Sequence, residues 1–193
     1  MAVQMQNSYW LHLPKAGGSW IEKVLLSSVK GARTMPVTKH AGLDKVPRGR
    51  FVFAFVRHPL EWYRSYWAYK MTVGWDKMNK SDNACKSKYF DEFITNIIDK
   101  NPGRYTSVCR EFCGHPDNPI DFTGRVENME EDLRHALKLA GEEIVRDVIG
   151  DTPPVNKSKK NFKDDAVYAS WQRDAIYDLD REAFERFGYN PKS

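Results

Sequence analysis

The chain has 193 residues, of which 41% are hydrophobic and 29% charged, and this composition is that of a folded globular protein rather than a disordered one. Its formal net charge of +4 suits an anionic ligand but is too small to indicate a nucleic-acid-binding protein. The sequence contains neither an apolar run of about eighteen residues nor a basic start followed by an apolar stretch, so we expect no transmembrane helix, membrane partner or secretory signal. An odd number of cysteines fits a reduced, cytoplasmic protein, although a bridge between Cys109 and Cys113 stays open.

The first half of the chain alternates strand and helix patterns. The β-prone residues 8–13 predict a strand, and a loop containing glycines follows it. A helix is then expected to begin at Ser19, with Glu22 three residues later completing a capping box. Residues 51–56 are an uninterrupted apolar run, which is typical of a strand covered on both faces. A proline next permits a helix to start, so residues 60–70 are predicted to be helical.

The second half continues this alternation. Residues 72–88 are polar and rich in turn formers, so we expect an irregular, mobile excursion. Apolar residues at helical spacing predict a helix over residues 89–99. A short strand is expected at 122–126, followed by a helix at 129–139. A final helical region is expected to run from about 164 to 187.

Strands that alternate with helices predict an α/β layered fold with a central, mostly parallel sheet flanked by helices. The absence of repeats and of a linker predicts a single domain over residues 1–193. Ligands in such folds bind at the carboxyl ends of the strands. Two sequence motifs lie at such ends.

The first motif is P-K-A-G-G-S-W, residues 14–20, between a predicted strand and a predicted helix. Two glycines let the backbone approach an oxyanion closely, and the amides at a helix start favour negative charge. Lys15 adds a mobile positive charge, and Ser19 adds a hydroxyl donor. A nucleotide loop of the G-x-x-x-x-G-K-[ST] type has its lysine after the glycines, whereas this lysine precedes them.

The second motif is V-R-H-P-L-E-W-Y-R-S-Y, residues 56–66. Arg57 leaves the end of the buried strand, and Ser65 lies in the next helix. A guanidinium offers a phosphate two parallel hydrogen bonds, and a nearby hydroxyl can add a third. The alternative for each is structural, because an arginine also pairs with carboxylates and a serine also packs between helices.

Together, in this order, the two motifs resemble those of the PAPS-dependent sulfotransferases, where PAPS is 3′-phosphoadenosine-5′-phosphosulfate. The first is similar to the family's 5′-phosphosulfate loop, P-K-x-G-[GT]-[ST]. The second is similar to its 3′-phosphate motif, R-[ND]-P-x-x-R-x-x-S-x-Y, although His58 replaces Asn or Asp and the interior arginine is displaced to Arg64. The family resemblance implies a P-loop-like three-layer fold.

Weaker similarities point to the carbohydrate branch of the family, in particular the heparan sulfate 2-O-sulfotransferases. These are F-C-G-H at residues 112–115, V-x-E-x-x-E-D at 126–132 and a basic loop at 156–163. The resemblance implies transfer of a sulfuryl group from PAPS to a hydroxyl acceptor, a carbohydrate or another small molecule, with adenosine 3′,5′-bisphosphate (PAP) as product. The sequence does not indicate the oligomeric state.

The same resemblance assigns roles to individual residues. Lys15 is implied to be catalytic, because it contacts the group being transferred. The residues implied to hold the cofactor are Lys15, Ala16, Gly17, Gly18, Ser19, Trp20, Arg57, Ser65, Lys159 and Lys160.

A hydroxyl acceptor needs a general base, since its pKa is far above neutrality. His40 is the leading candidate, because carbohydrate relatives have a catalytic histidine at a comparable point. Glu22 is the second candidate, although its predicted capping role explains it as well. We expect no metal site, because Cys109, Cys113 and the nearby His115 lack a second pair of ligands at zinc spacing.

Two other functions remain open at this stage. A nucleotide or small-molecule kinase with a degenerate phosphate loop would need a magnesium-binding carboxylate at a strand end, and residues 51–56 are followed by none. A non-catalytic protein that binds a nucleotide or an anionic glycan would keep Arg57 and Ser65 but would not need His40 or Lys15.

Overall fold

The computed structural model describes residues 2–36, 42–153, 162 and 164–191. The chain divides into two compact units, the first formed by Met1–Arg57 with Cys109–Asn156 and the second by His58–Val108 with Lys157–Ser193. The single domain over residues 1–193 stays a prediction.

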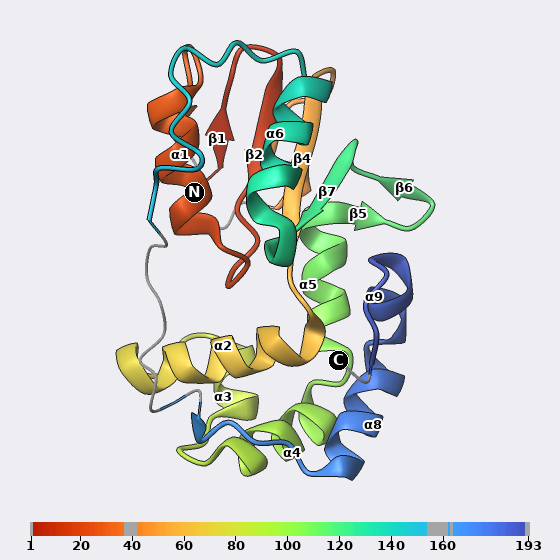
Figure 1. Ribbon diagram of the computed structural model, residues 1–193. Coiled ribbons are helices and arrows are strands. Elements are labelled where there is room, and N and C mark those ends of the chain that lie inside the picture. The colour runs from red at the N-terminus through yellow and green to blue at the C-terminus, as the bar shows by residue number, and fades with distance from the viewer. Residues whose placement is uncertain (1, 37–41, 154–161, 163, 192–193) are drawn as a thin grey trace. The chain divides into compact units, whose positions relative to one another are not determined.

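The first unit contains a five-stranded sheet with the order β3-β1-β2-β4-β7 (Figure 1). The strands are β1 Val3–Gln4, β2 Ser8–Leu11, β3 Arg33–Thr34, β4 Phe51–Val56 and β7 Phe122–Arg125. Strands β2, β4 and β7 are parallel, whereas β1 is antiparallel to both β2 and β3. The sheet is therefore mixed rather than mostly parallel, because the link from β1 to β2 is too short for the crossover that a parallel pair needs.

Helices α1, Gly18–Ser28, and α6, Met129–Leu139, pack on this sheet, α1 against β1 and α6 against β7. The buried positions of α1 include Trp20, Val24, Leu25 and Ser28. Short 3₁₀ turns at Leu43–Lys45 and Val126–Asn128 and a hairpin of β5, Gly114–His115, with β6, Asn118–Pro119, complete the unit. The fold is α/β with helices beside a central sheet, and the P-loop-like three-layer arrangement stays a prediction.

The second unit is helical. Its helices are α2 Pro59–Val73, α3 Lys80–Cys85, α4 Phe90–Lys100, α8 Ser170–Leu179 and α9 Arg181–Arg186. Helix α5, Arg104–Cys113, begins in this unit and ends in the first. It was not predicted, although Tyr105, Val108, Cys109, Phe112 and Cys113 recur at helical spacing and are all buried.

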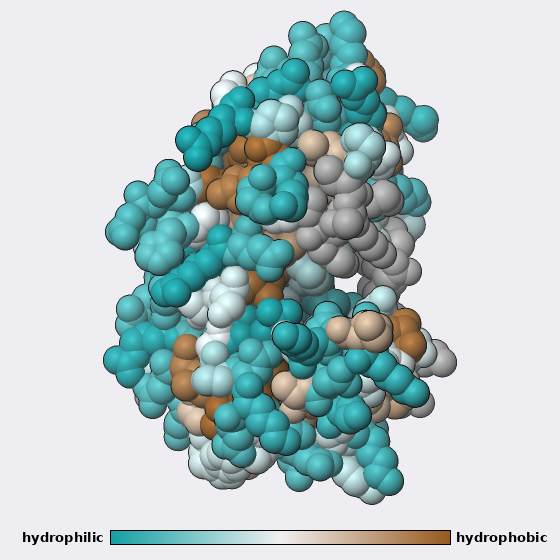
Figure 2. Space-filling view, turned by 180° about the vertical axis from the view of Figure 1, so that it is seen from behind, coloured by the Kyte–Doolittle hydropathy of each residue, from teal (hydrophilic) through white to brown (hydrophobic). Residues whose placement is uncertain are grey.

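Hydrophilic residues cover most of the face drawn in Figure 2, and the hydrophobic residues that reach it form small separate patches. The large aromatic side chains Trp10, Trp62, Tyr63 and Tyr105 are instead fully buried. Most of the aromatic residues therefore belong to the core, which is their usual place.

The C-terminal helical region is not continuous, contrary to the prediction over residues 164–187. Asp164 is helical, residues 165–169 are not, and α8 begins at Ser170. A second break falls at Asp180, whose buried carboxylate accepts hydrogen bonds from the Tyr63 hydroxyl and the Thr106 amide, each at 2.8 Å. The Tyr105 amide in turn donates to the Tyr63 oxygen at 3.1 Å. This network ties α2, α5 and the α8–α9 junction together. Burial raises the pKa of the Asp180 carboxyl despite these donors.

We predict a pH-dependent contribution of Asp180 to stability. Because the folded-state pKa is raised, the contribution is fully present below the pKa of an unfolded aspartate, about 3.9, and is lost as the pH rises through the folded-state pKa. Asp180→Asn cannot ionise, so its free energy of unfolding relative to the wild type should rise as the pH increases from about 4 to the raised folded-state pKa. Urea unfolding across this range measures the effect. An equal change in Asp178→Asn, an exposed carboxylate of α8, would contradict the assignment to burial.

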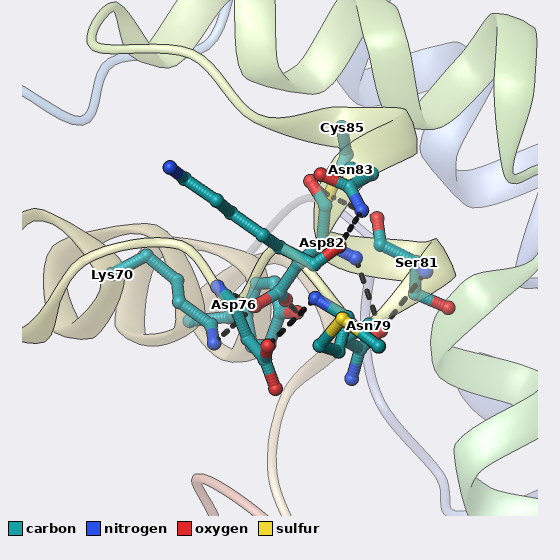
Figure 3. Close-up of polar contacts among 10 residues, drawn as sticks. Lys70, Asp76, Asn79, Ser81, Asp82, Asn83 and Cys85 are labelled. Atoms are coloured by element: carbon teal, nitrogen blue, oxygen red, sulfur yellow. Dashed lines mark hydrogen bonds and ion pairs between the residues drawn. The ribbon is translucent and has the colours of Figure 1, made fainter.

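Residues 72–88 are also more ordered than the prediction of an irregular excursion. They contain helix α3, which Asn79 caps by accepting hydrogen bonds from the amides of Ser81 and Asp82. The fully buried Asp82 accepts hydrogen bonds from Lys70 and Tyr66 of α2 and, at 2.9 Å, from the Asp76 amide (Figure 3). This carboxylate ties the segment to α2, together with the hydrogen bond from the Trp67 indole to the Ser87 carbonyl and the packing of the Trp75 ring against Tyr66 and Phe93. Hydrophobic spacing gave no sign of this, since much of the attachment is polar.

Candidate functional site

The loop of residues 14–20 joins β2 to α1 and has unusual backbone geometry. Lys15 has φ of 65°, and it is the single non-glycine residue with positive φ among those the structure describes. Gly17 has φ of 72° and is the N-cap of α1. Left-handed conformations at non-glycine residues are costly and persist where surrounding structure imposes them, often at functional sites. The backbone of this loop is therefore held in one particular shape.

Both glycines of the loop lie against neighbouring side chains. A Cβ atom added to Gly18 would come within 1.9 Å of the His12 ring, and one added to Gly17 would come within 2.6 Å of the Met129 sulfur. His12 is itself buried and stacks on Trp10 with ring centroids 5.2 Å apart, so it has little room to move. The G-G pair is thus required by packing within the protein as well as by any approach of an anion.

The N-cap of helix α1 lies two residues earlier than predicted. Gly17 rather than Ser19 is the N-cap, and no side chain caps the helix. The predicted capping box of Ser19 and Glu22 is therefore wrong, because the left-handed Gly17 already turns the chain into the helix and places Ser19 inside it. Glu22 loses its structural explanation and stays a candidate base, half-buried on α1.

Trp20 anchors the loop from inside. Its indole N–H donates to the Thr152 carbonyl at 2.8 Å, and its backbone N–H donates to the Gly17 carbonyl at 3.0 Å. The side chain is almost fully buried. Both N–H groups of Trp20 are therefore used within the protein, and its predicted contact with the cofactor stays a prediction. Ala16 is likewise buried, whereas Lys15 and Ser19 are partly exposed.

Arg57 comes directly after β4, at the sheet edge where the loop of Lys15 follows β2. The register pairs Leu11 with Ala54 in parallel, so the carboxyl ends of the two strands lie next to each other. The two positively charged residues therefore leave the same edge of the first unit.

A second arginine, and third positively charged residue, at this edge was missed. Arg125 ends β7 and is paired with Val56, the residue before Arg57. Its amide donates to the Asp132 carboxylate at 2.6 Å, which ties the end of β7 to α6. The signal that singled out Arg57, an arginine at the end of a strand, was present here as well. The edge thus carries Lys15, Arg57 and Arg125.

The other residues of the second motif lie in the second unit. Ser65 is buried on α2. Arg64, the displaced interior arginine of the motif, donates from Nε to the Ala166 carbonyl at 2.8 Å and pairs with Glu61 at 2.7 Å. Both contacts hold the Arg64 guanidinium within the second unit. The meeting of Ser65 with Arg57 at one phosphate stays a prediction.

Three predicted site residues, His40, Lys159 and Lys160, lie outside the described residues. The three cysteines are buried and form no disulfide, so Cys109 and Cys113 are not bridged. His, Cys, Asp and Glu residues within the described ranges form no group of three suited to a metal ion. Among the helices that the structure describes, none is long and apolar enough to cross a membrane.

Comparison with known protein families identifies the family of this chain. The model of the sulfotransferase family matches residues 9–190. This chain belongs to the sulfotransferase family. The match includes both motifs and both units, and the family domain makes the protein a transferase enzyme that transfers sulfuryl groups. Neither the curated proteins nor the solved structures gave a match to this sulfotransferase.

We predict that Gly18→Ala destabilises this sulfotransferase by about 1–3 kcal/mol, because its methyl group would overlap the buried His12 ring. Chemical denaturation measures the loss. Gly150→Ala is the matched control in the same unit, since an added Cβ there meets no atom within 4 Å, and it should change stability by less than about 0.5 kcal/mol.

The double variant His12→Ala/Gly18→Ala tests the cause of that loss. If the ring is the obstacle, its removal makes room for the methyl group, and the two substitutions together cost less than the sum of their separate effects. Strictly additive costs would show that Gly18 is required for another reason.

Proposed function

We propose that this sulfotransferase transfers a sulfuryl group from PAPS to a hydroxyl of a carbohydrate by in-line displacement. The observation that carries the proposal is the left-handed Lys15 beside the close-packed glycines, at the sheet edge that Arg57 also leaves. A cofactor with phosphates at both its 5′ and 3′ positions requires two phosphate-binding sites, each with positive charge and hydrogen-bond donors. ATP has no 3′-phosphate and would leave the second site unused.

The residues of the loop fit the 5′ end of this cofactor. The glycines bring backbone amides within reach of an oxyanion, and the start of α1 contributes the positive end of its dipole. When bound, PAPS supplies the sulfuryl group, and its 5′-phosphate is the leaving group. Lys15 neutralises the negative charge that develops on that phosphate, which lowers the barrier to transfer. Ser19 adds a hydroxyl at the same end.

The 3′-phosphate is assigned to Arg57 and Ser65, with Lys159 and Lys160 as further positive charges. Arg57 contributes the two-pronged hydrogen bonding of a guanidinium. Its neighbour at the strand ends, Arg125, adds positive charge to the same edge. These charges hold the nucleotide in a fixed position, so that the acceptor hydroxyl meets the sulfur opposite the leaving oxygen.

The acceptor hydroxyl loses its proton as its oxygen bonds to sulfur, and we assign that proton to His40, with Glu22 as the second candidate. Because Glu22 takes no part in capping α1, its predicted structural role no longer counts against it as the base. A carbohydrate acceptor is supported by the sequence similarities at residues 112–115 and 126–132. Those residues lie in the first unit, with the loop.

We expect Lys15→Ala to lower the rate of sulfuryl transfer from labelled PAPS by about 10²–10³-fold, as for loss of one charge-stabilising donor. Lys23→Ala removes an exposed lysine from α1 and should leave the rate unchanged. Full transfer by Lys15→Ala would contradict the proposed mechanism.

Calorimetry tests the cofactor separately: tighter binding of ATP with magnesium than of PAP would overturn the assignment to PAPS.

The same transfer assay distinguishes the two candidate bases when it is run with a panel of carbohydrate, phenol and steroid acceptors. Loss of a general base is expected to cost about 10²–10⁴ in rate. His40→Ala should show this loss, whereas Glu22→Gln should stay near the wild-type rate. The reverse result would move the role of base to Glu22.

A further inference from the structure

The ring of His58 is clamped by residues from the C-terminal end of the second unit. Its Nε2 atom lies 3.0 Å from the Asn190 carbonyl oxygen. Because a carbonyl only accepts, Nε2 carries the hydrogen and donates it. The ring also meets the edges or faces of Phe184 and Tyr189, with centroids 5.4 Å and 5.2 Å away. We call these four residues the His58 clamp.

The turn that ends α9 builds the clamp. Gly188 has φ of +66°, its amide donates to the Glu185 carbonyl at 3.3 Å, and the Tyr189 amide donates to the Phe184 carbonyl at 2.8 Å. This pair of hydrogen bonds is the Schellman motif, in which the residue after the glycine folds back on the last turn of the helix. The motif brings Tyr189 beside Phe184, and His58 contacts both rings. Asn190 follows immediately and supplies the acceptor.

His58 holds a special position in the chain. It directly follows Arg57, and it is the N-cap of α2, the helix that carries Ser65. Residues at N-caps commonly satisfy a helix amide with a short polar side chain, as the Asn or Asp of the resembling motif can do. His58 makes no such bond. Its side chain is used instead to hold the C-terminal turn, and it is only 7% exposed.

We propose that His58 is a positioning residue for binding the 3′-phosphate of the cofactor, an inference that rests on the proposed function. The clamp fixes the backbone of His58 and the first turn of α2. Arg57 directly precedes His58 in the chain, and Ser65 belongs to the helix that His58 caps. Geometry held by packed rings and a buried hydrogen bond limits the freedom of the groups that bind the phosphate.

The experiment compares PAP with adenosine 5′-monophosphate by calorimetry, since the two probes differ by the 3′-phosphate alone. The wild type should prefer PAP. His58→Asn shortens the side chain and loses the bond to Asn190, so PAP binding should weaken about tenfold while binding of the monophosphate changes by less than about twofold. His58→Gln is the rescue variant, because its amide N–H can occupy the place of Nε2, and it should bind PAP within about threefold of the wild type.

Tyr189→Ala tests the clamp from the other side and replaces His58→Asn if that variant does not fold. It should lower the preference for PAP, whereas Tyr189→Phe keeps the ring and should retain it. A wild type without preference for PAP would overturn the proposed function. A wild-type preference that His58→Asn or Tyr189→Ala keeps would overturn the role of the clamp alone. Equal weakening of both probes would also overturn it, because it indicates a general loss of structure.

Discussion

The parallel pairing of β2 with β4 determines where the chemistry of the first unit is placed. Because Leu11 pairs with Ala54, the loop of Lys15 and the residue Arg57 both emerge from the same edge of the sheet. The next pairing, of Val56 with Arg125, adds a third positive residue to that edge. An antiparallel pairing would have sent the two loops to opposite ends of the sheet. This register places the loop and Arg57 at the same end of the sheet.

Elements with a clear hydrophobic pattern could be predicted closely. The apolar run at residues 51–56 and the helix at 129–139 have the predicted bounds, since each pattern is long and unambiguous. Helix α5 was missed because its buried face uses tyrosine and cysteine among polar residues, and α3 was missed because a carboxylate rather than apolar packing holds it. The break at Asp180 depends on Tyr63 and Thr106, which are far away in sequence.

The motifs of the site were visible in the sequence, but its internal support was not. Lysine and glycine in a loop suggest anion binding, yet nothing in the letters indicates that Lys15 adopts a left-handed backbone or that His12 fills the space beside Gly18. Nor do they indicate that the Trp20 indole donates a hydrogen bond to the Thr152 carbonyl. That contact joins residues 132 positions apart, so only the folded structure reveals it.

The attachment of residues 74–88 through Asp82 has a consequence for how this part of the chain can diverge. A segment packed by many apolar residues tolerates few changes, because each one disturbs its neighbours. Here a few contacts hold the segment, namely one carboxylate bound by Lys70, Tyr66 and the Asp76 amide and the packed ring of Trp75, and most of the other side chains face water. Related chains are thus free to vary the outward residues, and even their number, while the helix beneath keeps its place. Such a segment lets an enzyme acquire new surface chemistry without rebuilding its core.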